Sequence, residues 1–368
     1  MRALICGGGT AGHVMPAIAI AEIIEKSFPG SVIAFAGRSG GAENEAYLKT
    51  KHRLYTVDIC GLNRSISLNS VKSVYKIIKS SRNARSIIDN FNPDLIIGTG
   101  GYVCYPFIRQ GQLMNIKTVI HESNASPGLV TRTLGGRCDT LLVNLEGTKA
   151  CLRKTDNVIT VGNPTRKDFG TLTKSEAKRR LRIPDGQKLI VSFGGSLGAE
   201  VLNESIGEFI NRYVLHNTGI CHIHATGKKH YNEMQDKYPA LFRKTQNIRI
   251  IPYIDDMPTV LNAADLAITR SGAITISELA RCGTPSILIP SPNVTGNHQH
   301  INAEYMRSLG AAVLIEEKNL CAEGLQMAVK NILDSQDNIR KMSASAKQAY
   351  TKNTDILIRN AVAELINR

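Results

Sequence analysis

Gly7-Gly8-Gly9-Thr10-Ala11-Gly12-His13 is the stretch of sequence that decides the fold. An apolar strand is expected directly before it, over residues 3–6, and a helix directly after it, over residues 14–26. Glycines at such a turn allow positive φ values and let the backbone approach a ligand closely. The N–H groups that open the helix favour a negatively charged or electron-rich ligand. The stretch therefore predicts a ligand site at the end of a strand, with the titratable His13 at its edge.

The loop by itself does not identify the ligand. It resembles the dinucleotide-binding fingerprint only loosely. In that fingerprint an acidic residue at the end of the second strand holds a ribose. The second strand expected here, residues 31–36, leads into Gly37-Arg38 instead. This disfavours NAD, leaves NADP as an alternative through Arg38, and leaves open a loop that only serves the turn of an α/β domain.

Apolar runs alternate with helical patterns along the whole chain, which is typical of parallel α/β proteins. The series restarts after residue 164 with a strand, a second glycine loop (Gly194-Gly195-Ser196-Leu197-Gly198) and a helix. We therefore predict an α/β fold of two Rossmann-like, doubly wound domains that face each other across a cleft. The predicted domains are residues 1–163 and 164–348, with a helix at about 349–368 that packs back on the first. The predicted strands are residues 3–6, 32–36, 54–58, 95–98, 118–121, 140–143, 188–193, 221–225, 248–251, 266–269, 286–289 and 312–315.

The charge and the aromatic content of the chain indicate which kinds of partner it can bind. The net charge of +14 predicts attraction to an anionic membrane surface. Nucleic acid is not expected, because the chain has no Trp and no platform of aromatic and basic residues for stacking bases. The sequence contains no apolar run of about eighteen residues, so no membrane span is predicted. The short apolar segment at the start does not fit a secretory signal. The eight scattered cysteines fit reduced thiols of a cytoplasmic protein.

A helix is expected over residues 69–90, and it carries a basic stripe. Its spacings of three and four place the cations on one side of the helix. Apolar residues form a neighbouring strip, so the segment is typical of an amphipathic helix at a membrane surface. The alternative is the solvated face of an ordinary packed helix, and the overall charge favours the membrane. The stripe consists of Lys72, Lys76, Lys79, Arg82 and Arg85.

Three further segments follow predicted strands and carry polar or glycine-rich sequence. Gly98-Thr99-Gly100-Gly101-Tyr102 is another glycine turn, which favours a ligand site. In His121-Glu122-Ser123-Asn124, the side chains of Glu122 and Asn124 fit either ligand contacts or hydrogen bonds within the loop. Residues 269–279 open a helix whose N-terminus suits a phosphate. Glu278 in that helix can accept hydrogen bonds from a ribose diol, or can serve only the helix dipole.

Residues 297–302 add amide side chains that suit sugar hydroxyls. His298 and His300 could suggest a metal, but no carboxylate or thiol pair lies nearby in the sequence, so we expect no metal site. The chain has neither the Asp-x-Asp motif of metal-bound nucleotide sugars nor a Walker loop. Helix N-termini and arginines such as Arg166 could handle phosphates instead.

Together these segments resemble the MurG family, over nearly the whole chain. Members of that family add N-acetylglucosamine to undecaprenyl-linked N-acetylmuramoyl-pentapeptide in peptidoglycan synthesis. The resemblance implies a GT-B glycosyltransferase that inverts the anomeric carbon, with no cofactor and no required metal. It is carried by the first glycine loop with Val14-Met15-Pro16-Ala17, by Gly100-Gly101-Tyr102-Val103, His121-Glu122-Ser123-Asn124, Val161-Gly162-Asn163-Pro164-Thr165-Arg166, Gly194-Gly195-Ser196-Leu197-Gly198-Ala199, Tyr253-Ile254-Asp255-Asp256-Met257, Arg270-Ser271-Gly272-Ala273 and Asn297-His298-Gln299.

The resemblance also implies roles for particular residues. Arg166 and the backbone at Ile254 would hold uracil, Glu278 the ribose, and Gln299 the N-acetylglucosamine. His13 would be the general base, with Glu122 as the competing candidate. The phosphates would lie at Ser196 and at the start of the 273–278 helix, which contains Ala273, Ile274, Thr275, Ile276 and Ser277. Thr10, Ala11, Gly12 and Asn124 would line the place where donor and acceptor meet.

Two positions depart from the family pattern. Ala11 stands where the family usually has Gly, which is tolerable if φ is negative there. Leu197 stands where the family usually has Gln, so one donor contact is missing or replaced.

The implied partners are UDP-N-acetylglucosamine, undecaprenyl-linked lipid I, the anionic cytoplasmic face of the cell membrane as a peripheral site, and proteins of cell-wall synthesis and division. The alternatives are a UDP-sugar epimerase, another GT-B transferase, a non-catalytic UDP-sugar-binding subunit and an NADP oxidoreductase.

Overall fold

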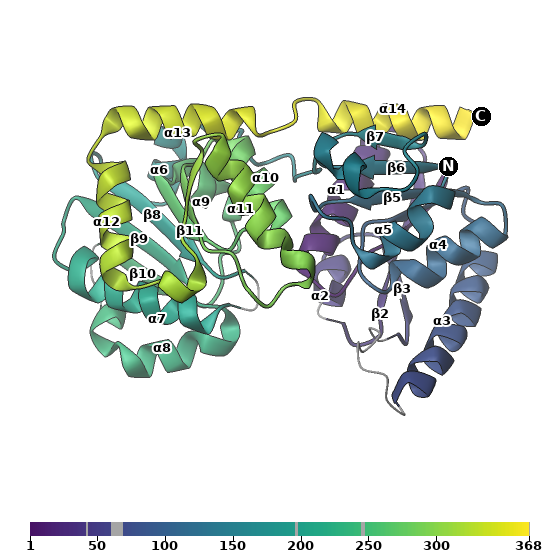
Figure 1. The fold of residues 1–368 in the computed structure, drawn as a ribbon, viewed down its shortest axis with the longest axis horizontal. Coiled ribbons are helices and arrows are strands. Elements are labelled where there is room, and N and C mark those ends of the chain that lie inside the picture. Colours follow the sequence, from purple (N-terminus) through teal and green to yellow (C-terminus); the bar gives the residue numbers. More distant parts are fainter. Residues whose placement is uncertain (42, 60–68, 196–197, 244–246, 368) are drawn as a thin grey trace. The chain divides into compact units, whose positions relative to one another are not determined.

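The computed structural model describes residues 1–41, 43–59, 69–195, 198–243 and 247–367; within these ranges the side chains of residues 11, 43, 69–78 and 295 are not described. The chain divides into two compact units. Unit 1 is Met1–Arg166 together with Thr351–Arg368, and unit 2 is Lys167–Tyr350. Each unit is built on its own parallel sheet with helices on both faces (Figure 1). The predicted fold class of two Rossmann-like α/β domains is confirmed.

The sheet of unit 1 has seven strands in the order β3-β2-β1-β4-β5-β6-β7, all parallel. Its central strands are buried on both faces, which explains their continuous apolar sequence. The elements of unit 1 are β1 (Arg2–Cys6), α1 (Ala11–Ser27), β2 (Val32–Arg38), α2 (Glu43–Leu48), β3 (Arg53–Val57), α3 (Asn69–Phe91), β4 (Leu95–Gly98), α4 (Cys104–Leu113), β5 (Lys117–Glu122), α5 (Leu129–Leu134), β6 (Thr140–Val143), β7 (Val158–Thr160) and α14 (Thr354–Asn367).

Two hydrophobic cores flank this sheet. On one face α1 and α14 pack together, and α14 contributes the buried side chains Ile358, Ala361, Val362 and Leu365. On the other face α4 packs against both α3 and α5. Figure 1 shows α14 in yellow at the end of the chain, after the connection from α13. The C-terminal segment is therefore an integral layer of unit 1, although most of unit 2 precedes it in sequence.

The strand β7 was missed in the sequence analysis, which ended the first series of strands at Val143. Only the first of its three residues, Val158, is buried, and the strand pairs with β6 alone. Such a short edge strand carries no readable alternation of polar and apolar residues.

The sheet of unit 2 has six strands in the order β10-β9-β8-β11-β12-β13, again all parallel. Helices α6, α9, α10 and α11 contribute to the core on one face, α7, α8 and α12 to the core on the other, and α13 to both. The elements are α6 (Lys174–Arg180), β8 (Lys188–Phe193), α7 (Glu200–Phe209), β9 (Ile220–Ala225), α8 (Tyr231–Lys237), β10 (Ile248–Ile251), α9 (Met257–Ala263), β11 (Leu266–Thr269), α10 (Ala273–Cys282), β12 (Ser286–Leu288), α11 (His298–Ser308), β13 (Ala312–Leu314), α12 (Ala322–Leu333) and α13 (Gln336–Gln348).

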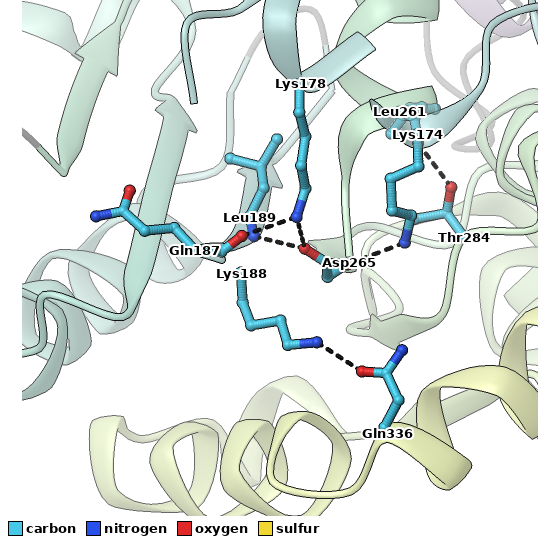
Figure 2. Close-up of polar contacts among 9 residues, drawn as sticks. All are labelled: Lys174, Lys178, Gln187, Lys188, Leu189, Leu261, Asp265, Thr284 and Gln336. Carbon is cyan, nitrogen blue, oxygen red and sulfur yellow. Dashed lines mark hydrogen bonds and ion pairs between the residues drawn. The ribbon is translucent and has the colours of Figure 1, made fainter. Parts of the chain in front are cut away.

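A buried carboxylate ties α6 to the second sheet. Figure 2 shows Asp265 between Lys174 and Lys178, at 3.0 and 2.7 Å, with the backbone N–H of Leu189 as a further donor at 2.8 Å. Burial alone would raise the pKa of Asp265, but the two ammonium groups and the N–H donor outweigh it and hold the pKa below its usual range. The first helix of unit 2 is thereby fixed beside the starts of β8 and β11.

The basic helix predicted over residues 69–90 is α3. Lys79, Arg82 and Arg85 are exposed, whereas Ala84 and Ile88 are buried against the sheet. The side chains of Lys72 and Lys76 lie outside the described residues. In the part of the chain that the structure describes, no helix is long and apolar enough to cross a membrane.

Candidate functional site

Three loops of unit 1 lie at one edge of the first sheet, because they follow neighbouring parallel strands. β1 leads into residues 7–13, β4 into residues 99–102 and β5 into residues 123–128. The first two loops interlock, since the N–H of Gly8 donates to the carbonyl of Gly100 at 3.3 Å. A Cβ on Gly101, whose φ is +82°, would lie 2.1 Å from the carbonyl oxygen of Gly8. Only glycine fits there, since any other residue would be strained and would collide.

His13 is held by the backbone of its own loop. Its Nδ1 lies 2.9 Å from the carbonyl oxygen of Gly8 and 3.3 Å from the hydroxyl of Thr10. A carbonyl oxygen only accepts, so Nδ1 carries the proton, and the lone pair of the neutral ring is on Nε2. The ring lies against Gly100, where an added Cβ would come within 2.5 Å of Cδ2. This arrangement suits a base that takes up a proton at Nε2.

The other predicted residues of this loop form the start of α1. Thr10 is the exposed N-cap residue and makes no side-chain cap hydrogen bond. Gly12 is half-buried. Ala11 is the first helical residue, so its backbone has the negative φ of a helix and tolerates a residue other than glycine. No acidic side chain occupies the first turn, so the N-terminus of α1 presents the positive end of its dipole.

Glu122 ends β5 and is 6% exposed. Its Oε1 accepts hydrogen bonds from the backbone N–H and the side-chain Nδ2 of Asn124, at 3.0 and 3.1 Å. Its Oε2 accepts from the backbone N–H of Gly128 at 2.8 Å and from the hydroxyl of Thr131 at 2.7 Å. Four donors thus converge on one buried carboxylate, and each of its two oxygens accepts two hydrogen bonds.

The residues around Glu122 are also fixed from the neighbouring segment. The carbonyl of Ser123 accepts hydrogen bonds from the side-chain amides of Asn144 and Asn163, at 3.1 and 3.2 Å. Nε2 of His121 lies 3.1 Å from the carbonyl oxygen of Gly162. Burial lowers the pKa of His121, so this ring is neutral at physiological pH. The segment from His121 to Asn124 is therefore rigidly held.

The second glycine loop follows β8 at the carboxyl edge of the second sheet. A Cβ on Gly194 would lie 2.6 Å from the backbone nitrogen of Ala199. Gly198 has a φ of +77°, and its Cβ would lie 2.1 Å from the carbonyl oxygen of Thr226. The loop is thus packed against both its own helix and the end of β9. The predicted contact residue Ser196 and the departure at Leu197 lie outside the described residues.

Helix α10 follows β11 at the same edge. Its N-cap, Gly272, supplies no side-chain cap, and its first turn has no acidic residue, so the helix end suits a phosphate. Thr275 and Glu278 are half-buried and, at a spacing of three, share one side of the helix. The remaining predicted residues of the helix are buried, and the hydroxyl of Ser277 donates within the helix to the carbonyl of Ala273 at 3.0 Å. These buried residues are Ala273, Ile274, Ile276 and Ser277.

Gln299 lies in the first turn of α11 and is joined to the segment before α10. Its backbone carbonyl accepts from the hydroxyl of Ser271 at 2.8 Å, and its Oε1 accepts from the N–H of Ser291 at 2.9 Å. The Nε2 group is therefore the donor that Gln299 can turn toward a sugar.

The remaining predicted residues lie in separate places. Ile254 is buried in the loop after β10, and Arg166, half-buried, is the last residue of the first segment of unit 1. Nδ1 of His300 lies 2.8 Å from a carboxylate oxygen of Glu316. Among the described residues, no three His, Cys, Asp or Glu side chains are grouped so that they could hold a metal ion.

Sequence analysis missed two positions that support the site of unit 1. The hydroxyl of Thr99 donates to the carbonyl of His13 at 2.7 Å. Its place inside a glycine turn was the signal that could have identified it. Thr131 holds Glu122 from a helix nine residues further along the chain, and no local sequence pattern marks it.

The two units match two halves of one known family. Residues 3–143 match the glycosyltransferase family 28 N-terminal domain, and residues 189–357 match its C-terminal domain. A UDP-N-acetylglucosamine–N-acetylmuramyl-(pentapeptide) pyrophosphoryl-undecaprenol N-acetylglucosamine transferase from Acetivibrio thermocellus is 36% identical over 366 residues, covering 100% of this chain and 98% of the relative. The chain belongs to glycosyltransferase family 28. A transferase of the same name from a Thermoanaerobacter species is 38% identical over 349 residues, 95% of each chain.

Solved structures agree with the family 28 fold. MurG from Acinetobacter baumannii superimposes with a TM-score of 0.75 at 23% identity and covers 99% of both chains. A UDP-GlcNAc 2-epimerase from Neisseria meningitidis, bound to UDP-GlcNAc, has a TM-score of 0.65 at 15% identity and covers 100% of both chains. At these identities the likeness establishes the fold, which transferases and epimerases share.

Proposed function

We propose that this chain transfers N-acetylglucosamine from UDP-N-acetylglucosamine to the C4 hydroxyl of N-acetylmuramoyl-pentapeptide-pyrophosphoryl-undecaprenol. This reaction converts lipid I to lipid II in peptidoglycan synthesis. The observation that carries the proposal is the identity of 36% over the whole chain to a transferase named for these substrates. The fold alone would not distinguish a transferase from an epimerase.

His13 is the proposed general base. The acceptor hydroxyl attacks the anomeric carbon from the face opposite UDP, and its proton passes to Nε2 of His13. The new C–O bond forms as the bond to the diphosphate breaks, and UDP leaves with the electron pair. The protonated Nδ1, held by the carbonyl of Gly8, supports this choice because it places the lone pair on Nε2. General base catalysis of this kind contributes roughly 10²–10⁴-fold.

The donor is proposed to bind at the carboxyl edge of the second sheet. The N-terminus of α10 would receive the diphosphate, with Ser196 and Arg166 as further contacts, and would stabilise the leaving group. Glu278 would accept hydrogen bonds from the ribose diol, and Nε2 of Gln299 would donate to the N-acetylglucosamine. The backbone at Ile254 and the side chain of Arg166 would hold uracil.

Product analysis tests this function. The chain is incubated with UDP-N-acetylglucosamine and a soluble lipid I analogue in EDTA, and the products are identified by mass spectrometry. We expect the acceptor to gain one N-acetylglucosamine with no added metal. Formation of UDP-N-acetylmannosamine without acceptor would identify an epimerase, and binding of the donor with no product would identify a binding subunit.

We also propose that unit 1 docks on the anionic cytoplasmic face of the membrane, where the acceptor lipid lies. The exposed cations Lys79, Arg82 and Arg85 on α3 support this, as do the exposed side chains of Leu113 on α4 and Leu129 on α5, which are 55% and 61% accessible. Basic residues beside apolar ones are the combination that an anionic bilayer attracts. A peripheral site of this kind would place the chain beside proteins of cell-wall synthesis and division.

Vesicle binding tests the docking proposal. The triple variant Lys79→Glu, Arg82→Glu, Arg85→Glu is compared with Lys318→Glu, Arg340→Glu, Lys341→Glu, an equal charge change at exposed positions of unit 2. At about 1 kcal/mol for each cation, the first variant should bind phosphatidylglycerol vesicles on the order of 100-fold more weakly in sedimentation, and the second much less so. Equal losses would show that only net charge matters.

A further inference from the structure

Glu122 has a carboxylate in the region proposed for the acceptor, so it competes with His13 for the role of base. A general base needs a lone pair that a substrate proton can reach. The carboxylate of Glu122 is 6% exposed, and each of its oxygens already accepts two hydrogen bonds from donors within unit 1. Taking up a proton there would disrupt at least one of these bonds.

The four donors belong to one short stretch of chain. Asn124 is two residues beyond Glu122, Gly128 is the N-cap of α5, and Thr131 lies in the first turn of that helix. Thr131 is itself 4% exposed. The carboxylate therefore closes the loop of residues 123–128 between the end of β5 and the start of α5, and sets the position of everything between them.

One consequence concerns the amide of Asn124. A carboxylate oxygen can only accept, so the group that faces Oε1 of Glu122 must be the NH₂ group of Asn124. The amide oxygen, Oδ1, is therefore turned away from Glu122. Asn124 is half-buried, and its loop lies at the same edge of the sheet as the loop of His13. Oδ1 is an acceptor suited to a sugar hydroxyl.

We infer that Glu122 and Thr131 are positioning residues, which fix the amide of Asn124 so that its Oδ1 receives a hydroxyl of the acceptor sugar. Neither one takes the proton. This inference rests on the proposed function, because it assigns the acceptor of that reaction to this loop. The hydroxyl of Thr131 donates to Glu122, a contact that helix formation does not require.

The first test uses Thr131→Val, which keeps the shape of the side chain and removes the hydroxyl. Thr133→Val is the matched control, because the hydroxyl of Thr133 bonds only to carbonyls of its own helix in the described structure. We expect Thr131→Val to lower kcat/KM for the acceptor roughly 10- to 100-fold with an unchanged KM for UDP-N-acetylglucosamine. Thr131→Ser should restore most of the loss. Wild-type kinetics for Thr131→Val would overturn the inference.

The second test is the pH dependence of Glu122→Gln. The NH₂ group of the new glutamine would face N–H and O–H donors that now bond to Glu122, so kcat/KM should fall. The acidic limb of the pH profile should stay where it is in the wild type, because His13 remains. Loss of that limb would identify Glu122 as the base and overturn the inference.

A third pair of variants serves if Thr131→Val does not fold. Gly128 has a φ of −72°, which proline adopts, and a Cβ there would lie 3.6 Å from Oε2 of Glu122, an ordinary contact. Gly128→Pro removes the N–H donor, whereas Gly128→Ala keeps it. We expect the alanine variant to be at least tenfold more active than the proline variant, and equal activities would overturn the inference.

In every test the wild-type chain is first shown to need the acceptor for activity. A failure of the proposed function would appear in that control, and a failure of the inference would appear only in the variants.

Discussion

The proton on His13 is placed by a backbone carbonyl, and this decides what the residue can do. With Nδ1 held by Gly8, proton uptake can occur only at Nε2. Glu122 ends β5, two strands from β1 in the same sheet. Unlike His13, it has no oxygen left for a substrate proton, because both of its oxygens accept hydrogen bonds from donors within unit 1. The two candidate bases that the sequence offers, His13 and Glu122, therefore differ in their hydrogen bonds.

Two buried histidines of unit 2 show how burial controls charge. His222 and His224 on β9 both contact the hydroxyl of Ser192, at 2.7 and 2.8 Å, so they share one face of the strand. Burial lowers the pKa of His224 to about 4, and burial together with the charge of His224 lowers the pKa of His222 well below its usual range. Both rings are therefore neutral in the folded chain at pH 7.

The stability of unit 2 should depend on these rings. Between the unfolded pKa of about 6.5 and the folded pKa of His224, the unfolded chain binds more protons, so the free energy of unfolding falls as pH falls. We expect a slope of up to about 1.4 kcal/mol per pH unit for each ring in urea titrations from pH 7 to pH 5. His224→Gln should reduce the slope and His216→Gln, an exposed position, should not. An unchanged slope in His224→Gln would contradict this account.

At the scale of elements, the two glycine loops of unit 1 are a single interlocked structure. Gly101 packs closely against the backbone of Gly8, and Gly100 packs against the ring of His13. The position of His13, the proposed base, thus depends on a turn that lies more than eighty residues away in sequence. The loops after β1 and β4 are held together because these strands are neighbours in the sheet.

Gly101→Ala should therefore affect both stability and activity. Left-handed strain and collision with Gly8 should cost unit 1 about 2–5 kcal/mol and lower kcat on the order of 100-fold. Gly40→Ala is the control, because Gly40 also has a positive φ, +65°, but no described atom lies within 4 Å of the added Cβ. Strain alone should cost it about 1–2 kcal/mol. Equal costs in thermal and urea unfolding would show that the loops do not interlock as described.

The alternation of apolar runs and helical patterns was sufficient to predict the fold class and twelve of the thirteen strands in the described part of the chain. Long buried strands such as β8 give continuous apolar runs, whereas β7 has three residues and was missed. The glycine loops could be recognised from sequence because only glycine tolerates such backbone. The hydrogen bond from Thr131 to Glu122 could not be recognised from sequence, because it depends on where α5 begins relative to β5.

At the scale of the whole molecule, the chain folds as two units whose sequences are not contiguous. The last helix, α14, belongs to unit 1 after the chain has completed unit 2. Its residues Ile358 and Val362 are almost completely buried in the same core as α1, the helix that carries His13. Removing the C-terminus would therefore expose the core beneath the first glycine loop, far from it in sequence.

Ile358→Ala tests this arrangement. A buried isoleucine replaced by alanine should cost about 2–5 kcal/mol, and the loss should appear in the unfolding transition of unit 1 alone. Ile356→Ala, on the same helix but 47% exposed, is the matched control and should cost much less. Differential scanning calorimetry separates the two transitions. A shift confined to the transition of unit 2 would contradict the assignment of α14.

We propose that the chain is a transferase that needs no metal and uses His13 as its base. The most direct measurement is the rate of UDP release from UDP-N-acetylglucosamine in EDTA, with and without a lipid I analogue, for the wild type and for His13→Ala. The account predicts release only when the acceptor is present, and a rate roughly 10²–10⁴-fold lower in the variant. Release that does not depend on acceptor would contradict the transferase, and a fully active His13→Ala would contradict the base.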